Sequence, residues 1–390
     1  MIRVCHVITQ LELGGAQKVA LHTASHLDRS RFAAEVAAGP GGMLDEDARS
    51  LGIPFHTVRS LRREVSLAGD MAALAELTRL LRRLRPDIVH THSSKAGILG
   101  RWAAMLAGVP HTVHSIHGYG FHPGQAPARR WLFVSLERLT GRHATSVFVT
   151  VSRANLQAGL DLELFPPPRA ALIHYGVRLG DFRPADRNGA AGRPLVVGMI
   201  GCLKPQKAPL DFVAVAARVL KAPDAPAGAR FVLVGDGVLR PDVERAIALE
   251  GLQERVILAG WRRDIPELLR GFDLLLHTSR WEGLPIAFLE AMATGLPIVA
   301  TRVDGAPDAV EDGVTGYLLD SGDVEGLARR TAELLRDGAL RRSMGAEALR
   351  RSAAWDIDGM VGRQERLYEA LVREGPARAV AQSTQIEPGA

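Results

Sequence analysis

The chain alternates short runs of β-branched and apolar residues with longer amphipathic runs of helical period over almost its whole length. Such alternation is typical of parallel βαβ units, in which each helix crosses a sheet to reach the next strand. The expected strands are 4–8, 35–38, 55–58, 87–90, 112–116 and 147–151, followed by 195–200, 231–234, 256–258, 274–277 and 298–301. The clearest expected helix is 71–84, a leucine-rich segment that Pro86 stops.

Chain length divides these units into two domains. The 390 residues exceed the roughly 250–300 that one hydrophobic core usually serves. A polar stretch at 185–194, which contains Gly189, Gly192 and Pro194, has the composition of a linker. We therefore predict an α/β fold of two Rossmann-like, doubly wound domains, 1–184 and 193–354. Ligands are expected in a cleft between them, beyond the carboxyl ends of the strands.

The composition excludes several classes of protein. No apolar run approaches the roughly 20 residues of a membrane-spanning helix, and the first residues do not resemble a leader peptide. Cys5 and Cys202 lie far apart and suggest no disulfide framework, so we expect a cytoplasmic protein. The final residues, 374–390, are expected to form a disordered tail.

Charge is distributed unevenly along the chain. Residues 1–180 hold 21 Lys and Arg against 13 Asp and Glu, whereas the remainder holds 27 against 30. The basic half predicts an anionic partner, such as a phosphorylated acceptor or a membrane surface. Arginines spread over solvated faces would give the same count. No nucleic acid partner is expected, because the basic residues are not interleaved with aromatic ones and no known binding motif is present.

The run from Ser279 to Glu290 follows an expected buried strand and reads Ser-Arg-Trp-Glu-Gly-Leu-Pro-Ile-Ala-Phe-Leu-Glu. Pro285 suits the first position of a helix that ends near Gly295. The free N–H groups of the loop and of the helix N-terminus suit a phosphate. The carboxylates of Glu282 and Glu290, on either side, could bind the hydroxyls of a sugar and of a ribose. On spacing alone, a helix-start carboxylate and a solvated one are an equal alternative.

Glu282 and Glu290, with seven residues between them and Gly-Leu-Pro after the first, resemble the signature of the large retaining glycosyltransferase family of group 1, or family 4. That family contains many bacterial mannosyl-, glucosyl- and galactosyltransferases. Further motifs match in the family's order over nearly the whole chain: Gly14-Gly15-Ala16-Gln17, His117-Gly118, Val234-Gly235-Asp236-Gly237, Gly260-Trp261, and Gly313 with Thr315-Gly316. The resemblance implies the two-domain GT-B fold, with the acceptor bound by the N-terminal domain and the nucleotide sugar by the C-terminal one. It also implies a helix near 355–373 that crosses back to the N-terminal domain.

The resemblance assigns roles within the C-terminal half. Glu282 would contact the hydroxyls of the donor sugar as a catalytic residue. The backbone of Gly283 and Leu284 would lie against sugar and phosphate. Glu290 would bind the ribose, and Lys207 would neutralise the diphosphate leaving group.

Four further positions follow from the same resemblance. Gly15 would let the N-terminal backbone approach the diphosphate, and His117 would lie near the sugar and take part in catalysis. The nucleobase would pack near Trp261 and Arg262.

The chain departs from the family at one position. Five residues before Lys207, where the family usually has an arginine, stands Cys202, which cannot grip a phosphate with a charged fork. Lys204 lies two residues further on and at strand periodicity would share a face with Cys202. Lys204 is therefore expected to supply part of the missing charge to the diphosphate.

The function implied is retaining transfer of a sugar from a UDP- or GDP-sugar to a glycan or polyprenyl-linked acceptor, in the biosynthesis of bacterial exopolysaccharide or lipopolysaccharide. The acceptor would attack from the side of the leaving group, whose phosphate helps to remove its proton. No metal and no other cofactor would be required. Two alternatives stay open: a nucleotide-sugar epimerase or phosphorylase on the same fold, and a non-catalytic protein that binds sugar nucleotides.

The segment 129–138 is both basic and apolar, and it lies in the half that binds the acceptor in this family. It predicts peripheral contact with an anionic membrane at the inner face of the plasma membrane. A buried helix whose arginines reach out to solvent would fit the same pattern.

The histidines suggest a metal site that the strand period argues against. His111 and His117 would share one face of a strand and His114 the other, so the three cannot converge on one ion. His90 and His92 could share a face, although hydrogen-bonded histidines at a strand end are the commoner arrangement.

Other short motifs point to different enzymes. Asp45-Glu46-Asp47 and Asp356-Ile357-Asp358 match the Asp-x-Asp of metal-dependent sugar transferases, but both fall where helices are expected to start. Gly235-Asp236-Gly237 is only a fragment of the nicotinamide-binding fingerprint.

Overall fold

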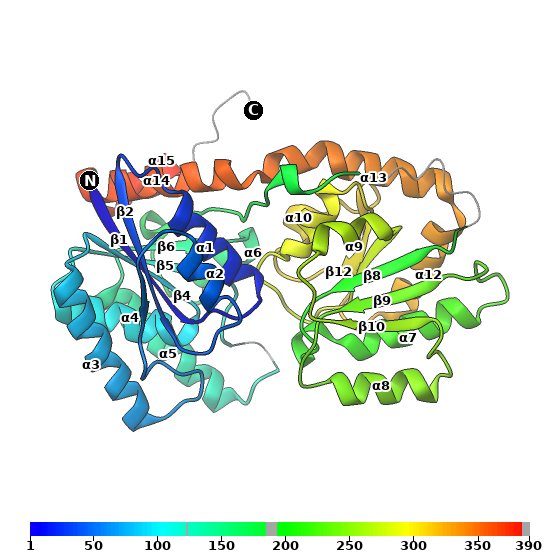
Figure 1. Cartoon of the computed structure of the whole chain (residues 1–390), viewed down its shortest axis with the longest axis horizontal. Helices are drawn as coiled ribbons and strands as arrows, with labels where there is room; N and C mark the ends of the chain where they lie inside the picture. The colour runs from blue at the N-terminus through cyan, green and yellow to red at the C-terminus, as the bar shows by residue number, and fades with distance from the viewer. Residues whose placement is uncertain (122–123, 185–192, 384–390) are drawn as a thin grey trace. The chain divides into compact units, whose positions relative to one another are not determined.

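The computed structural model describes residues 1–121, 124–184 and 193–383. The chain forms two compact units (Figure 1). One comprises Met1–Tyr175 together with the chain from Asp358 onward, and the other is Gly176–Ile357. The chain thus passes from one unit to the other at Tyr175–Gly176, before the predicted linker at 185–194, of which 185–192 lie outside the described residues.

The first unit is built on a seven-stranded parallel sheet of order β3-β2-β1-β4-β5-β6-β7. Its strands are β1 (Ile2–Gln10), β2 (Phe32–Gly39), β3 (Phe55–Thr57), β4 (Ile88–His92), β5 (His111–Ile116), β6 (Val147–Thr150) and β7 (Ala170–Leu172). Its helices are α1 (Gly15–His26), α2 (Asp45–Ser50), α3 (Leu67–Leu84), α4 (Ser94–Ala107), α5 (Pro127–Ala144), α6 (Arg153–Asp161), α14 (Ile357–Glu374) and α15 (Pro376–Ser383). The six strands predicted for this half are confirmed, and the short edge strand β7 was not predicted.

Helices cover both faces of this sheet, and so its central strands are buried on both sides. Val7 of β1 and Val89 of β4 pack with Leu77 of α3 and with α4 on one face. Ile8 of β1 and Ala20 of α1 belong to a second cluster with α2. Burial on both faces is the usual state of a parallel sheet with crossover helices.

The end of the chain returns to the first unit, as predicted. Glu365 of α14 pairs with Arg31 and accepts a hydrogen bond from the backbone N–H of Asp28 at 2.7 Å. Tyr368 of the same helix is fully buried, with its hydroxyl 2.5 Å from Nδ1 of His90. These contacts hold α14 against the segment that precedes β2 and against strand β4.

The expectation of a disordered tail at 374–390 is wrong for residues 376–383, which form helix α15. Gly375, at φ 89°, ends α14, and Pro376 opens the new helix. Ala379 of α15 is fully buried, and the helix packs on β7 and on the short 3₁₀ helix Pro167–Arg169. Residues 384–390 lie outside the described part of the chain.

The second unit is built on a six-stranded parallel sheet of order β10-β9-β8-β11-β12-β13. Its strands are β8 (Val196–Ile200), β9 (Arg230–Val234), β10 (Val256–Gly260), β11 (Leu274–His277), β12 (Ile298–Thr301) and β13 (Gly316–Leu319). Its α-helices are α7 (Pro209–Lys221), α8 (Arg240–Leu249), α9 (Ile265–Gly271), α10 (Ile286–Ala293), α11 (Ala306–Ala309), α12 (Val324–Arg336) and α13 (Gly338–Ser352), and its 3₁₀ helices are η2 (Leu179–Asp181), η3 (Pro205–Lys207) and η4 (Ala353–Trp355). The edge strand β13 was not predicted, and the other five strands were. Two doubly wound α/β units confirm the predicted fold class.

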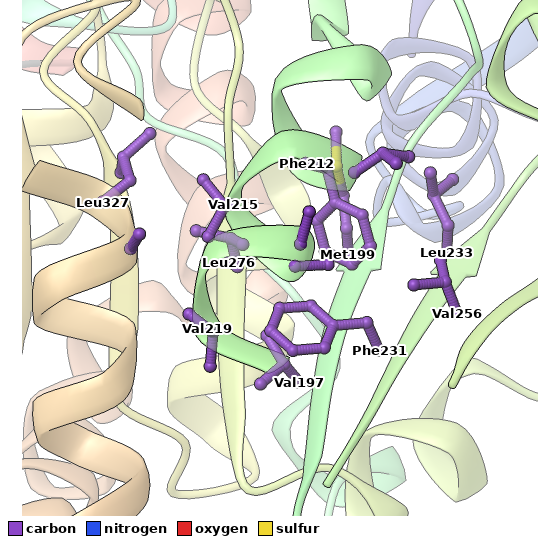
Figure 2. Packing of buried hydrophobic residues seen from close by; sticks show 14 of the residues in the cluster. Val197, Met199, Phe212, Val215, Val219, Phe231, Leu233, Val256, Leu276 and Leu327 are labelled. Carbon is purple, nitrogen blue, oxygen red and sulfur yellow. The ribbon is translucent and has the colours of Figure 1, made fainter. Parts of the chain in front are cut away.

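The core of the second unit lies between its sheet and helices α7 and α12 (Figure 2). Phe212 of α7 meets Phe231 of β9 edge to face, with ring centroids 5.6 Å apart and an interplanar angle of 72°. Val197 and Met199 of β8 surround the two rings, and all four side chains are fully buried. This core holds β8 and α7 together, and thereby positions the loop that joins them.

Replacing Phe212 by alanine should lower the free energy of unfolding by about 3–5 kcal/mol, because the ring leaves a cavity among side chains that cannot collapse fully. Urea denaturation followed by circular dichroism measures the change. Leu249→Ala, at a side chain that is 83% exposed, is the control and should shift stability by less than about 0.5 kcal/mol. Equal unfolding midpoints for the two variants would contradict this account of the core.

Candidate donor site

Three loops meet at the carboxyl end of the second sheet, where the adjacent strands β8, β11 and β12 end. Thr278, directly after β11, donates its hydroxyl to the backbone carbonyls of Lys207 and Ala208, both at 3.0 Å. Thr301, at the end of β12, donates to the carbonyl of Ser279 at 2.6 Å. Both threonines are fully buried. Their hydrogen bonds therefore join the three loops to one another beneath the surface.

The carboxylate of Glu282 is the centre of this arrangement. Glu282 is only 7% exposed, and its Oε1 forms an ion pair with Nζ of Lys207. The same oxygen accepts from the hydroxyl of Ser279 at 2.6 Å and lies 3.1 Å from Nε2 of His277. Three donors, one after β8, one at the end of β11 and one in the loop that follows it, therefore converge on one oxygen.

Electrostatics fix the charges of this cluster. Burial alone would raise the pKa of Glu282, but the Lys207 ammonium and the contact with His277 outweigh it and lower the pKa to about 2. Burial lowers the pKa of His277, so that imidazole is neutral. It must therefore donate Nε2–H to the carboxylate. The site holds an ionised acid, a cation and a neutral histidine.

The backbone of the Glu282 loop is held by the loop after β12. The N–H of Glu282 donates to Oδ2 of Asp304 at 2.5 Å, and the N–H of Gly305 donates to the carbonyl of Gly283 at 3.0 Å. Asp304 has a φ of 36°, in the left-handed region that aspartate tolerates better than most residues. Burial and the charge of Glu282 raise the pKa of Asp304.

Lys207 is positioned by the short helix η3. The neighbouring residue, Gln206, accepts from the N–H of Arg280 at 2.7 Å through its carbonyl and donates its side-chain amide to the carbonyl of Trp281 at 3.0 Å. Arg280 pairs in turn with Asp211 at 2.7 Å. The loop that carries the cation and the loop that carries the acid are thus joined along their length.

The other residues predicted for the donor are spread more widely. Gly283 and Leu284 are buried next to Glu282, and Glu290 is half-buried within α10. Trp261 and Arg262 follow β10, at the edge of the sheet, two strands away from β8. Trp261 is 40% exposed, and Arg262 pairs with Asp264. The structure thus brings together the acid, the cation and the Gly-Leu backbone, whereas Trp261 and Arg262 lie at the edge of the sheet.

The predicted orientation of Lys204 is wrong in its premise. Strand β8 ends at Ile200, so Cys202 and Lys204 lie in a loop where the alternation of strand faces no longer applies. Lys204 instead precedes η3 with an extended backbone, and its carbonyl accepts from the N–H of Lys207 at 2.9 Å. Cys202 is a free, half-buried thiol.

Gly15 and His117 lie in the first unit. Gly15 is the first residue of α1, and His117 directly follows β5. Nδ1 of His117 lies 2.5 Å from the hydroxyl of Tyr175, and its Nε2 lies 2.9 Å from Nδ1 of His92. Burial lowers the pKa of His117 to about 4. Both ring nitrogens therefore have partners within the unit, and a sugar hydroxyl would have to replace one of them.

The histidines behave as the strand period predicts. His114 lies 2.9 Å from the hydroxyl of Thr91, away from the partners of His117, so the two do not converge on one ion. His90 and His92 share a face and are hydrogen-bonded. His6 joins them from β1, and one nitrogen from each of these three rings lies within 4.8 Å of the others. The involvement of His6 was not predicted.

The remaining motifs have structural roles. Asp45 begins α2, and Asp356 and Asp358 flank the first residue of α14, which confirms both as helix starts. Gly235 has a φ of 129°, and a Cβ there would lie 2.2 Å from the carbonyl oxygen of Gly201. This glycine is needed because the backbones of the loops after β8 and β9 approach each other closely here.

Glu282 and the residues that contact it form an acid cluster: Lys207, His277, Ser279 and Asp304. Three of them, His277, Ser279 and Asp304, were not predicted from the sequence. One signal was present, since His277 is the single histidine after residue 181 and ends the strand that precedes Glu282. Asp304 carried none, because it meets Glu282 only through the pairing of β11 with β12.

Two doubly wound units with an ionised acid and a lysine at the carboxyl end of the second sheet define the GT-B class of glycosyltransferase. The chain belongs to the group 1 glycosyltransferases. The family model "Glycosyl transferases group 1" matches residues 194–337, and "Glycosyl transferase 4-like domain" matches residues 14–176. The predicted family and fold are confirmed, and the chain is a glycosyltransferase.

Two curated relatives and one solved structure show how far the similarity extends. The UDP-Gal:alpha-D-GlcNAc-diphosphoundecaprenol alpha-1,3-galactosyltransferase of Escherichia coli is 32% identical over 352 residues, which are 87% of this chain and 89% of that protein. The 2-deoxystreptamine N-acetyl-D-glucosaminyltransferase of Streptomyces fradiae is 31% identical over 75% of this chain and 71% of its own length. Anabaena Alr3699/HepE in complex with UDP and glucose superposes with a TM-score of 0.83 at 20% identity, over 95% of this chain and 100% of that one.

The depressed pKa of Glu282 predicts that the free energy of unfolding of the wild type, relative to that of Glu282→Gln, depends on pH. Because the folded pKa, about 2, lies below the ordinary 4.5, ionised Glu282 contributes stability above pH 4.5, and this is lost as the pH falls toward 2. The contribution is about 3 kcal/mol, of which roughly 2 kcal/mol should be lost by pH 3. Urea unfolding of the wild type and Glu282→Gln should show their difference narrowing between pH 5 and 3. Glu244→Gln, at an exposed ion pair with Arg240, is the control; a difference for Glu282→Gln that stays constant would rule out the depressed pKa.

Proposed function

We propose that the chain transfers a sugar, with retention of configuration, from a UDP-sugar to an acceptor linked to a polyprenyl diphosphate. The observation that carries the donor half is the buried Glu282 carboxylate, ionised and paired with Lys207 where three strand-end loops meet. The relative from Escherichia coli, named for UDP-galactose and a diphosphoundecaprenol-linked acceptor, supports both the UDP donor and the lipid-linked acceptor. We place the reaction in the assembly of a bacterial surface polysaccharide.

The chemistry follows from the charges of the site. Cleavage of the bond between sugar and phosphate leaves negative charge on the diphosphate, and the Lys207 ammonium stabilises it. The N-terminus of α10 and the backbone of Gly283 and Leu284 add N–H dipoles to the same region. Glu282 binds the sugar hydroxyls and stabilises the positive charge that develops on the ring. The departing phosphate takes the acceptor's proton, so the reaction proceeds without a protein base.

The remaining donor contacts are proposals of the same kind. Glu290 binds the ribose, and Trp261 with Arg262 borders the nucleobase. Gly15 allows the backbone to approach the diphosphate, and His117 contacts the sugar as a catalytic residue. We further propose that transfer requires no metal ion or other cofactor, because Lys207 supplies the charge that a metal would supply.

The central experiment supplies purified protein with UDP-galactose and other UDP- and GDP-sugars, with and without a synthetic polyprenyl-diphosphate-linked N-acetylhexosamine, in the presence of EDTA. Transfer should need the acceptor and should give a product with the donor's anomeric configuration. Conversion of the donor alone would instead identify an epimerase or a hydrolase, and phosphate-dependent release would identify a phosphorylase. Binding without turnover under every condition would identify a non-catalytic protein.

Three substitutions test the donor site. Glu282→Ala should abolish transfer, and Lys207→Ala should lower kcat by about 100-fold or more, because each removes charge that acts on the breaking bond. Lys204→Ala should weaken donor affinity if that side chain reaches the diphosphate. Lys221→Ala, at an exposed lysine paired with Glu250 in the same unit, is the control and should leave both kinetic parameters unchanged.

Circular dichroism establishes that each variant is folded. An active Glu282→Ala enzyme would remove the basis of the proposed site, and unchanged donor affinity in Lys204→Ala would refute a diphosphate contact for Lys204 alone.

A lipid-linked acceptor also calls for contact with a membrane. Within 1–121, 124–184 and 193–383, none of the helices combines the length and apolar character needed to cross a bilayer. Helix α5 buries one face, including Val134 and Thr140, and exposes Trp131 (70%), Leu132 and Leu139 on the other. Its outer face therefore has an apolar strip bordered by arginines. We propose that this strip rests on the inner face of the plasma membrane.

Replacing Trp131 and Leu132 together by alanine should weaken binding to phosphatidylglycerol vesicles by about tenfold or more, since less apolar surface enters the interface. Co-sedimentation measures the bound fraction. The matched control is Met105→Ala with Leu106→Ala, two consecutive exposed apolar residues on α4 of the same unit. Equal binding to neutral and anionic vesicles, or an equal loss in the two double variants, would argue against α5 as the membrane surface.

A further inference from the structure

The first unit contains a row of buried imidazoles of which the proposed chemistry uses only one, His117. From Tyr175, the row runs to His117, then from its Nε2 to Nδ1 of His92 at 2.9 Å, and from Nε2 of His92 to Nδ1 of His6 at 3.0 Å. His6 lies on β1, His92 ends β4, and His117 follows β5, so three neighbouring strands contribute one ring each. Each inner ring uses both of its nitrogens within the row.

All three rings are neutral. Burial lowers the pKa of His6 to about 3 and that of His117 to about 4. Burial and the neighbouring imidazoles hold the pKa of His92 well below its ordinary value. A neutral imidazole carries one N–H and one acceptor nitrogen, so each ring can donate through only one of its two contacts.

Only two proton arrangements satisfy every contact in the row. If the Tyr175 hydroxyl donates to Nδ1 of His117, then Nε2 of His117 must donate to His92, and Nε2 of His92 must donate to His6. If Nδ1 of His6 donates instead, every bond runs the other way and His117 carries its proton on Nδ1. The tautomers of the three histidines are therefore coupled, and no ring can change without the others.

The inner end of the row selects between these arrangements. Nε2 of His6 is buried and has no hydrogen-bond partner. In the first arrangement it would be an unpaired N–H, and in the second an unpaired acceptor. Buried N–H groups without a partner are the rarer of the two in proteins, which favours the second arrangement. His117 then presents Nδ1–H toward Tyr175 and accepts from His92.

We propose that His6 and His92 are positioning residues that fix the tautomer of His117 through this row of hydrogen bonds. The inference rests on the proposed function for its consequence, because His117 is the residue proposed to meet the donor sugar. A hydroxyl that replaces Tyr175 would then accept from Nδ1–H of His117. His6, although remote from the sugar, would in this way determine whether Nδ1 of His117 donates a hydrogen bond to it.

The same histidines offer a competing arrangement that the experiment must separate. One nitrogen each of His6, His90 and His92 lies within 4.8 Å of the others, a grouping that could hold a metal ion. In the structure both nitrogens of His90 are engaged, with Ser115 at 2.8 Å and Tyr368 at 2.5 Å, and both nitrogens of His92 are engaged within the row. Nδ1 of His6 bonds His92, and only its Nε2 lacks a partner among the nitrogens of these three rings. Hydrogen bonds therefore account for five of these six nitrogens without an ion.

The test is long-range ¹⁵N–¹H NMR of the full-length protein labelled at histidine, with the His117 signals assigned from their loss in His117→Asn. The wild type should show His117 as the Nδ1–H tautomer. His6→Ala removes the donor at the end of the row, so His117 should become a mixture of tautomers. His6→Asn places an amide N–H near the former Nδ1 and should restore the wild-type tautomer. His114→Asn, a buried histidine bonded to Thr91 outside the row, is the matched control and should leave His117 unchanged.

Kinetics distinguish positioning from folding. His6→Ala should lower kcat about tenfold, the effect of one hydrogen bond, with KM for the donor little changed, and His6→Asn should recover it. An unchanged His117 tautomer in folded His6→Ala, or stoichiometric zinc in the purified wild type, would overturn the proposal. Absence of any sugar transfer by the wild type would refute the proposed function alone, because the NMR result does not depend on turnover.

Discussion

The buried charge of Glu282 is the constraint around which the second unit is organised. A carboxylate that is 7% exposed would be strongly destabilising unless a cation and donors surround it. Lys207, Ser279 and His277 supply them, and they come from the ends of two adjacent strands. The loops after β8 and β11 must therefore close on each other, and the loop after β12 fixes the Glu282 backbone. The same contacts that make the acid tolerable also preorganise it for a ligand.

Sequence patterns predicted the architecture where the signal is local and repeated. Alternating strands and helices, with glycine and proline at their ends, gave both doubly wound units and every strand except β7 and β13, edge strands of three and four residues. Helix α15 was missed because a short alanine-rich segment is ordered only by packing on the first unit. Lys204 was misplaced because strand periodicity was applied to residues 202–204, beyond the expected end of the strand at residue 200, which is where β8 ends.

The sequence predicted the motif residues of the candidate site, but not the residues that hold Glu282 in place. Glu282 and Lys207 lie 75 residues apart, and only the family resemblance linked them before the structure showed the ion pair. His277 and Ser279 lie close to Glu282 along the chain, at the end of β11 and in the loop after it, but nothing in the sequence shows that their side chains turn toward the acid. Asp304 meets Glu282 only through the pairing of β11 with β12, which no spacing along the chain encodes. The row from His6 to His117 has the same origin, since β1, β4 and β5 are neighbours in the sheet but far apart in sequence.

The two buried polar clusters solve the desolvation problem in opposite ways, and the difference bears on the loss of the family's arginine at Cys202. The acid cluster keeps its charges and pairs them, whereas the histidine row stays neutral and satisfies itself through tautomers. In the proposed reaction an arriving diphosphate meets a lysine that already neutralises Glu282. An ammonium has three donors, so Lys207 can keep its carboxylate contact while binding a phosphate oxygen. A guanidinium at position 202 would have supplied a second cation. Under the proposed function, donor binding without it would depend on how the Lys207 charge is shared between Glu282 and the diphosphate, and on whether Lys204 adds its own.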